Sequence, residues 1–133
     1  MCNIEFKDIR NQEIIKFENI NLLYDDIINR ITFDLILEFD FFRAKTQLEA
    51  EESDFVDLIK NLKKIYERKA CTFVFNPIGE QFKMRFSFQE NGYIKVLGKL
   101  SNSLFTGNLE FEYSTDQSFI PELIMQIETT IIR

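Results

Sequence analysis

The chain has 133 residues, a net charge of −6, 45% hydrophobic residues and no histidine. This length suits one domain, spanning residues 1–133, whose core needs neither disulfides nor a metal ion. Without histidine the commonest general base and metal ligand are missing, so we expect no enzyme activity, no metal and no other cofactor.

The amino terminus has no basic segment followed by an apolar one, and no apolar run is long enough to span a bilayer. We therefore expect a cytoplasmic protein without a membrane partner. The two cysteines, Cys2 and Cys71, form no CxxC pattern, and we expect both thiols to stay reduced.

The first part of the chain is predicted to form strands. Two short ones cover residues 3–7 and 13–17. From residue 31 to residue 41, apolar side chains at odd positions alternate with mostly polar ones at even positions, which is typical of a half-buried strand. We expect Phe41 to lie on the buried side of this strand with the other odd-numbered residues.

A helix is predicted next. Apolar residues recur at three- and four-residue spacing between Phe55 and Tyr66, which indicates one buried face. Acidic residues precede this stretch and Lys63 and Lys64 lie near its end, an arrangement that complements the helix dipole. Ser53 is the expected N-cap.

The second half of the chain is predicted to contain four more strands and a final helix. The strands alternate apolar and polar residues at 71–75, 82–88, 94–100 and 109–113. The helix should begin near Ser118, because Pro121 is tolerated only in a first turn.

The faces of two neighbouring strands predict the loop between them. A two-residue turn would place Phe88 opposite Lys95, whereas a three-residue loop places Phe88 opposite Ile94. The second register keeps the apolar faces together, so we predict a three-residue loop with Gly92 in the left-handed conformation. Gly98 would then lie on the apolar face, where another element can approach closely.

These elements predict an overall architecture. The strands are joined by short connections, except where the first helix intervenes, and short connections produce antiparallel pairs. We therefore predict an α+β fold with one curved antiparallel sheet of about six or seven strands and two helices packed on one of its faces.

Charge is segregated along the chain. Residues 18–57 hold 11 acidic and 3 basic side chains, whereas residues 60–99 hold 9 basic and 3 acidic ones. One interpretation is internal pairing, in which basic residues of the middle strands meet Glu110 and Glu112 across the sheet. The other is an acidic surface that attracts a basic protein partner. Its candidate residues are Asp34, Glu38, Asp40, Glu49, Glu51, Glu52 and Asp54.

Two other classes of function fit the sequence poorly. Nucleic-acid binding is disfavoured because the acidic segment repels phosphate and the aromatic residues near the basic ones are expected to be buried. A carboxylate-dependent enzyme would need two acids that converge in a deep pocket, whereas Glu110 and Glu112 share the polar face of one strand. The candidates for exposed aromatic rings are Tyr24, Phe42, Tyr93 and Phe105.

The last third of the chain carries a more specific pattern. Gly92 and Gly98 lie in a predicted hairpin, the pattern Leu-x-Phe-x-Tyr follows at residues 109–113, and the run Asp-Gln-Ser-Phe-Ile-Pro at residues 116–121 opens the final helix. This order, which follows the first predicted helix and its strands, resembles the WapI-type immunity proteins of bacteria. The resemblance covers residues 31–133.

That resemblance implies a cytoplasmic protein that binds and neutralises a cognate toxin domain, often a nuclease, by occlusion and without catalysis. The toxins of this class are secreted and contact-dependent. A basic toxin domain would meet the acidic candidates. The residue types of the run 116–121 suit a capped helix start, so we expect this run to serve as scaffold and not as the binding site. Two alternatives stay open: a general protein-interaction or regulatory module, and a carboxylate-dependent enzyme or small-ligand binder.

Overall fold

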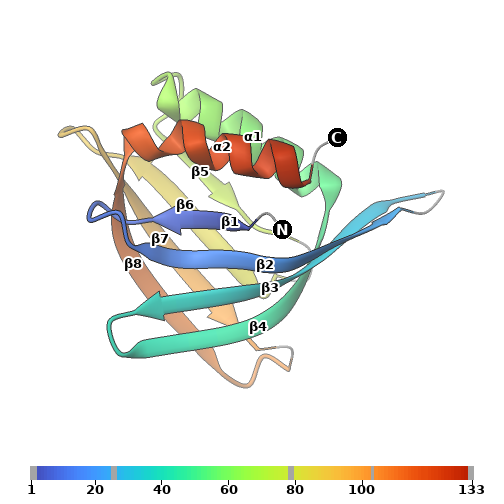
Figure 1. Ribbon diagram of the computed structural model, residues 1–133. Coiled ribbons are helices and arrows are strands. Elements are labelled where there is room, and N and C mark those ends of the chain that lie inside the picture. The colour runs from blue at the N-terminus through green and yellow to red at the C-terminus, as the bar shows by residue number, and fades with distance from the viewer. Residues whose placement is uncertain (1–2, 25–26, 78–79, 103, 132–133) are drawn as a thin grey trace.

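A computed structural model describes residues 3–24, 27–77, 80–102 and 104–131. Within them, eight strands form two four-stranded antiparallel sheets, and two helices lie side by side, with the second helix along the edge strand that begins the first sheet and the first helix next to the strand that begins the second (Figure 1). The α+β class and the two helices are confirmed. The prediction of one curved sheet of six or seven strands is wrong, because the strands before and after the first helix belong to different sheets.

The first sheet holds the N-terminal strands in chain order. They are β1 (Ile4–Lys7), β2 (Glu13–Tyr24), β3 (Asn29–Phe39) and β4 (Phe42–Glu51). The sequence predicts β2 only as far as Phe17, since a bulge follows between Glu18 and Asn21 and interrupts the period of two. The strand β4 is not predicted, because apart from Leu48 and Ala50 its side chains are partly or fully exposed.

The predicted end of β3 is also wrong. The strand stops at Phe39, and Asp40 takes a φ of 45°, which reverses the chain so that Phe39 pairs with Phe42. Phe41 therefore lies at the tip of the turn and is fully exposed, not buried.

The second sheet holds the remaining strands, again in chain order. They are β5 (Thr72–Phe75), β6 (Phe82–Phe88), β7 (Tyr93–Ser101) and β8 (Asn108–Asp116). The predicted three-residue loop is confirmed, because Phe88 pairs with Ile94 and the amide of Gln89 donates to the carbonyl of Tyr93 at 2.8 Å. Gly92 has a φ of 87°, as predicted.

Gly98 lies on the apolar face, where the ring of Phe111 fills the space that a side chain would need. A Cβ placed on Gly98 would stand 2.0 Å from Cζ of Phe111. The predicted close approach is therefore confirmed, and the approaching group comes from the neighbouring strand, β8.

The first helix, α1 (Glu52–Tyr66), begins with a capping box. Glu51 is the N-cap, and its own amide donates to Oδ2 of Asp54 at 2.9 Å. The prediction that Ser53 caps this helix is wrong, since Ser53 lies inside the first turn and its hydroxyl donates to Glu51.

Residues 116–121 form a capped helix start, which agrees with the expected scaffold role. The carboxylate of Asp116 accepts a hydrogen bond from the amide of Ser118 at 2.9 Å and caps a short 3-10 helix, η1 (Gln117–Phe119). The second helix, α2 (Ile120–Thr130), follows at once with Pro121 in its first turn. It lies against β1, where Oε1 of Gln126 accepts a hydrogen bond from the amide of Glu5 at 2.9 Å.

One hydrophobic cluster takes side chains from both sheets and both helices. Phe17 of the first sheet is its centre: its ring centroid lies 4.5 Å from that of Phe33, and 6.2 Å from those of Phe55 on α1 and Phe82 on the second sheet. The inner faces of the two sheets and the helices therefore share a core. Cys71 carries a free, exposed thiol, and Cys2 lies outside the described residues.

Candidate interaction surface

The seven acidic residues predicted to bind a partner are spread along the β3–β4 hairpin. Glu38 and Asp40 lie at its turn and Asp34 lies midway along β3. The other four lie at the opposite end, where β4 runs into α1. The structure therefore separates the candidates into two groups at the two ends of the hairpin, with Asp34 between them.

Basic residues of the same hairpin accompany three of these acids on the outer face of the first sheet. Exposed ion pairs of this kind contribute little to stability, but they give this face a mixed charge. The pairs are Glu38 with Arg43 at 3.7 Å, Asp34 with Lys45 at 4.0 Å, and Glu49 with Arg30 at 3.1 Å.

The acids at the start of α1 have structural contacts. Glu51 and Asp54 form the capping box, and Oε2 of Glu52 accepts a hydrogen bond from the side chain of Asn29 at 2.6 Å. These contacts tie the helix start to β3 and β4. The binding role of all seven acids stays a prediction.

The outer face of the second sheet is basic. The internal pairing expected there is confirmed for Lys95, whose Nζ lies 3.5 Å from Oε1 of Glu112. Lys83 instead lies directly opposite Lys99 in the β6–β7 ladder, a like-charged neighbour that costs stability. Among the described residues, no carboxylate lies within 4.0 Å of the charged groups of Lys83, Arg85 or Lys99.

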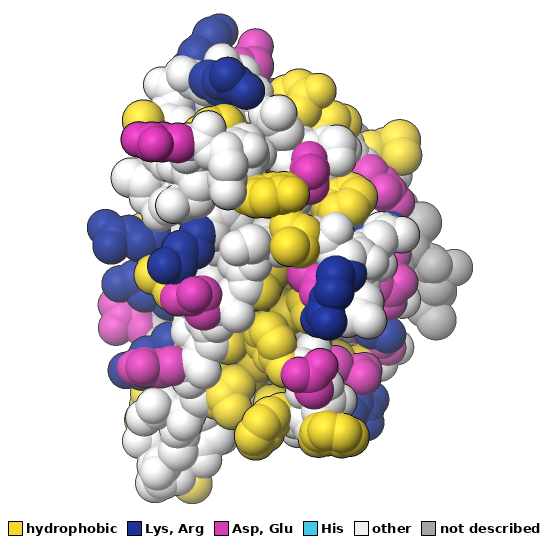
Figure 2. All heavy atoms as spheres, turned by 90° about the vertical axis from the view of Figure 1, so that its left-hand side faces the viewer, with side chains coloured by type: hydrophobic (Ala, Val, Ile, Leu, Met, Phe, Trp, Pro, Cys, Tyr) yellow, Lys and Arg dark blue, Asp and Glu magenta, His cyan; other side chains and the backbone are white. Residues whose placement is uncertain are grey.

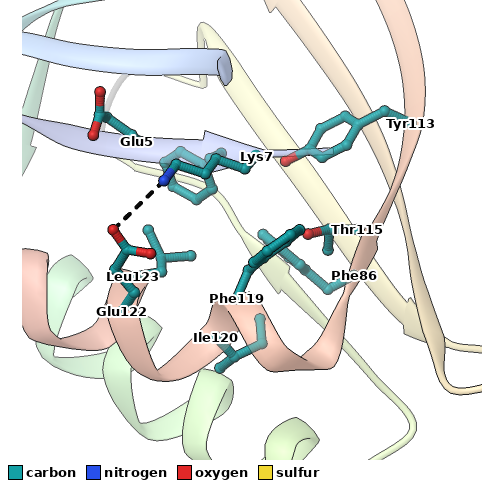
Figure 3. A pocket seen from close by; sticks show the side chains of 10 residues that line it. Glu5, Lys7, Phe86, Tyr113, Thr115, Phe119, Ile120, Glu122 and Leu123 are labelled. Atoms are coloured by element: carbon teal, nitrogen blue, oxygen red, sulfur yellow. Dashed lines mark ion pairs between the residues drawn. The ribbon is translucent and has the colours of Figure 1, made fainter. Parts of the chain in front are cut away.

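A small cavity lies between β1, β8 and α2 (Figure 3). Glu5 and Glu122 both line it, and Nζ of Lys7 lies 3.5 Å from Oε1 of Glu122. The cavity volume of about 10 Å³ leaves room for a single water molecule at most. The two carboxylates therefore do not converge on a space that could hold a substrate.

Two ionisable groups at this cavity have shifted pKa values. Burial raises the pKa of Tyr113, and the nearby carboxylate of Asp8 adds to the effect. A hydrogen bond between Glu5 and Glu13, followed by burial, raises the pKa of Glu5. Both shifts arise from the packing of β1, β2 and β8 and need no ligand to explain them.

A larger, open groove lies between the β3–β4 turn and β8. It has a volume of about 230 Å³ and is lined by Phe39, Phe42, Leu109 and Phe111 together with the glutamates of β8. Phe42 is 72% exposed, and Phe41 beside it is fully exposed. Figure 2 shows a strip of hydrophobic side chains running down this face between two charged flanks. Apolar patches of this kind, with charged rims, mark interaction sites in soluble proteins.

Four aromatic residues that the sequence nominates as exposed are confirmed. Phe42, Tyr24, Phe105 and Tyr93 are all exposed. Phe42 alone among these four lines the groove. The sequence therefore identifies one residue of the groove, Phe42. It does not identify the second wall, β8, because that wall is formed only when the two sheets pack together.

The strand β8 forms an edge of the second sheet along this groove. The amide of Ile9 donates to the carbonyl of Ser114 at 2.9 Å, so the backbone of Ser114 points away from β7. Backbone groups of an antiparallel strand alternate in direction, and those of Glu110 and Glu112 therefore point to the same open side. Among the residues that the structure describes, no other backbone group bonds to this edge at Glu110 or Glu112.

Two features are absent from the described residues. No three His, Cys, Asp or Glu side chains in these parts of the chain are grouped in a way that could hold a metal ion. No helix among them is long and apolar enough to cross a membrane.

Comparisons with known proteins give one specific result. A family model described as the immunity protein WapI-like family matches residues 5–133, so the match includes most of the first 30 residues, which carried no resemblance in the sequence alone. No curated protein matches the chain. A solved structure of the plant transcriptional regulator PBF-2 aligns with 97% of this chain and 78% of its own, at 7% identity and a TM-score of 0.43. That structural likeness is too weak to carry an argument.

Proposed function

This chain belongs to the WapI-like immunity protein family, and from that premise we propose that it binds a cognate bacterial toxin domain and neutralises it by occlusion, without catalysis of its own. Family membership supports a toxin-immunity role, and the match over residues 5–133 is the observation that carries the proposal. The surface is compatible with it, because an apolar groove with charged rims is suited to a protein partner.

We further propose that the toxin domain is a basic nuclease, met in the cytoplasm of the producing cell. A nuclease needs a cationic surface to hold the phosphates of its substrate. An immunity protein that covers such a surface with carboxylates would both attract the toxin and block its substrate. The acids of the β3–β4 hairpin are the candidates for this contact, and those at the turn, Glu38 and Asp40, also lie next to the groove.

The direct experiment uses the product of the gene next to this one, which the proposal takes to be the toxin domain. Cells that express this domain alone should stop growing, and co-expression of the immunity protein should restore growth. The purified proteins should bind with an affinity that falls as salt concentration rises. Absence of both rescue and binding would refute the proposed function.

The acidic surface has its own test. The double reversal Glu38→Lys with Asp40→Lys should weaken toxin binding at least tenfold and reduce its salt dependence. The matched control, Glu67→Lys with Glu128→Lys, changes the net charge equally at exposed positions away from the hairpin. Equal affinity of the two double variants would remove the acidic surface from the proposal while leaving the immunity role intact.

A further inference from the structure

We propose that the open edge of β8 is where the partner docks, by adding an extended strand whose apolar side chains enter the groove at Phe42 and whose alternate side chains are Lys or Arg. The identity of the partner as the toxin domain rests on the proposed function. The mode of binding rests on three features of β8: its unpaired backbone groups, the apolar groove beside it, and the charges of Glu110 and Glu112.

The backbone supplies the first argument. The amide and carbonyl groups of Glu110 and Glu112 point away from β7, and Ile9 closes the edge only at Ser114. The edge of β1 in the first sheet lies beside α2, and the edge of β5 lies beside α1. The strand β8 meets the helices only at its C-terminal end, where it leads into η1 and α2, and its first residues lie at the far end of the sheet (Figure 1). An uncovered edge of this kind is a template for a strand from another chain.

The groove supplies the second argument. Side chains of a strand added next to β8 would alternate between the two faces of the sheet. Those in register with Leu109 and Phe111 would point to the inner side, into the groove of about 230 Å³ closed on its far wall by Phe39 and Phe42. Apolar side chains at these positions would cover Phe42, which is 72% exposed in the free protein.

Charge determines the other positions of the added strand. Its remaining side chains would lie beside Glu110 and Glu112 on the outer face. Glu112 has Lys95 at 3.5 Å. Glu110 lies opposite Lys99 in the β7–β8 ladder, but among the described residues no basic group is within 4.0 Å of its carboxylate. Opposite charges on neighbouring strands attract and like charges repel, so Lys or Arg fits beside these glutamates and Asp or Glu does not.

The same charges disfavour a second copy of this chain as the occupant. If two copies paired their β8 strands in antiparallel fashion around Phe111, Glu110 of one copy would lie beside Glu112 of the other. Charged residues on an edge strand are a known protection against self-pairing. Charge repulsion therefore disfavours pairing of two β8 edges, whereas a strand with basic side chains is attracted to this edge.

A peptide experiment tests the mode of binding without the toxin. The probe is an end-blocked octapeptide in which Lys alternates with Val or Ile, and the control has Glu in place of every Lys. The basic peptide should slow hydrogen exchange at the amides of Glu110 and Glu112, and the acidic peptide should leave exchange unchanged. Equal effects of both peptides, or none from either, would overturn the proposal, as would a concentration-dependent dimer that protects the same amides.

Variants test whether the toxin uses this edge. Phe42→Asp removes the groove wall, and Glu110→Pro removes an amide that faces the open edge while keeping the bonds to β7. Each should weaken toxin binding at least tenfold. Val74→Asp is the matched control, because Val74 is an exposed apolar residue on β5, at the opposite edge of the same sheet. It should change the affinity less than twofold.

The outcomes separate the two proposals. If the toxin binds the unaltered protein and all three variants equally well, the β8 proposal is refuted and the immunity role stands. If the toxin does not bind the unaltered protein, the proposed function fails. The peptide experiment then still shows whether the edge of β8 pairs with a basic extended strand. Thermal unfolding of each variant identifies any loss of toxin binding that comes from misfolding. Phe42→Asp should affect folding least, because it changes an exposed side chain.

Discussion

Replacing Gly98 with alanine should destabilise the protein, because the added Cβ would collide with the ring of Phe111. Replacing an exposed glycine with alanine should cost less, because no such ring stands in the way. The new Cβ would stand 2.0 Å from Cζ and 2.5 Å from two further carbons of Phe111. Separations below 3.0 Å are not tolerated, so the ring must move. The backbone of Gly98 needs no left-handed conformation, and the cost therefore comes from packing alone.

The contacts of Phe111 give the magnitude. Its ring centroid lies 5.7 Å from that of Phe39, 6.4 Å from that of Phe82 and 6.5 Å from that of Tyr113. Each aromatic pair contributes about 0.5–1.5 kcal/mol, and overpacking of a core costs about 1–3 kcal/mol. Displacement of the ring should thus lower the free energy of unfolding by about 2 kcal/mol.

Urea denaturation followed by far-ultraviolet circular dichroism measures this loss. For a domain of this size, 2 kcal/mol corresponds to a fall of about 1 M in the midpoint. Gly107→Ala is the control, since nothing lies within 4 Å of a Cβ at Gly107, and its midpoint should not change. In a Phe111→Leu background, which shortens the obstructing side chain, Gly98→Ala should cost less than in the unaltered protein. The same cost in both backgrounds would refute the explanation.

Three further predictions concern the cap, the acid pair and the like-charged pair. Asp116→Ala removes the cap of η1 and should cost about 1 kcal/mol in urea denaturation. Glu5→Gln should stabilise the protein at pH 7 more than at pH 4: the raised pKa of Glu5 beside Glu13 means that the folded state holds a proton more tightly, so stability falls as pH rises through that pKa. Lys83→Glu places an acid opposite Lys99 and should raise the urea midpoint slightly, an effect that high salt removes.

The β6–β7 hairpin could be predicted because its two faces are chemically distinct. Only the three-residue loop keeps Phe88 with Ile94 and Met84 with Gly98, so the pattern determines the register. The capped start of the final helix follows for a similar reason, since Asp116 and Pro121 each suit one position in a helix start.

The division into two sheets could not be predicted. The strand β4 has few buried residues, and its charged side chains read as part of the acidic segment before the helix. The alternation of apolar and polar residues shows which segments are strands, but it does not show which strands are hydrogen-bonded to each other. When β4 is not predicted, the boundary between the two sheets cannot be located. The groove depends on this division, because its walls come from the β3–β4 turn in one sheet and from β8 in the other.

The hydrogen bond from the amide of Glu5 to Gln126 joins residues 121 positions apart. Among the described elements, β1 is synthesised before the other strands and α2 after all of them, so the segment from Glu5 to Gln126 must leave the ribosome before this contact can form. Contacts of such long sequence separation close late and slow the completion of folding. Newly made protein would therefore pass through a stage in which β1 is paired with β2 but not yet covered by α2, and the protein reaches its final fold only after that stage.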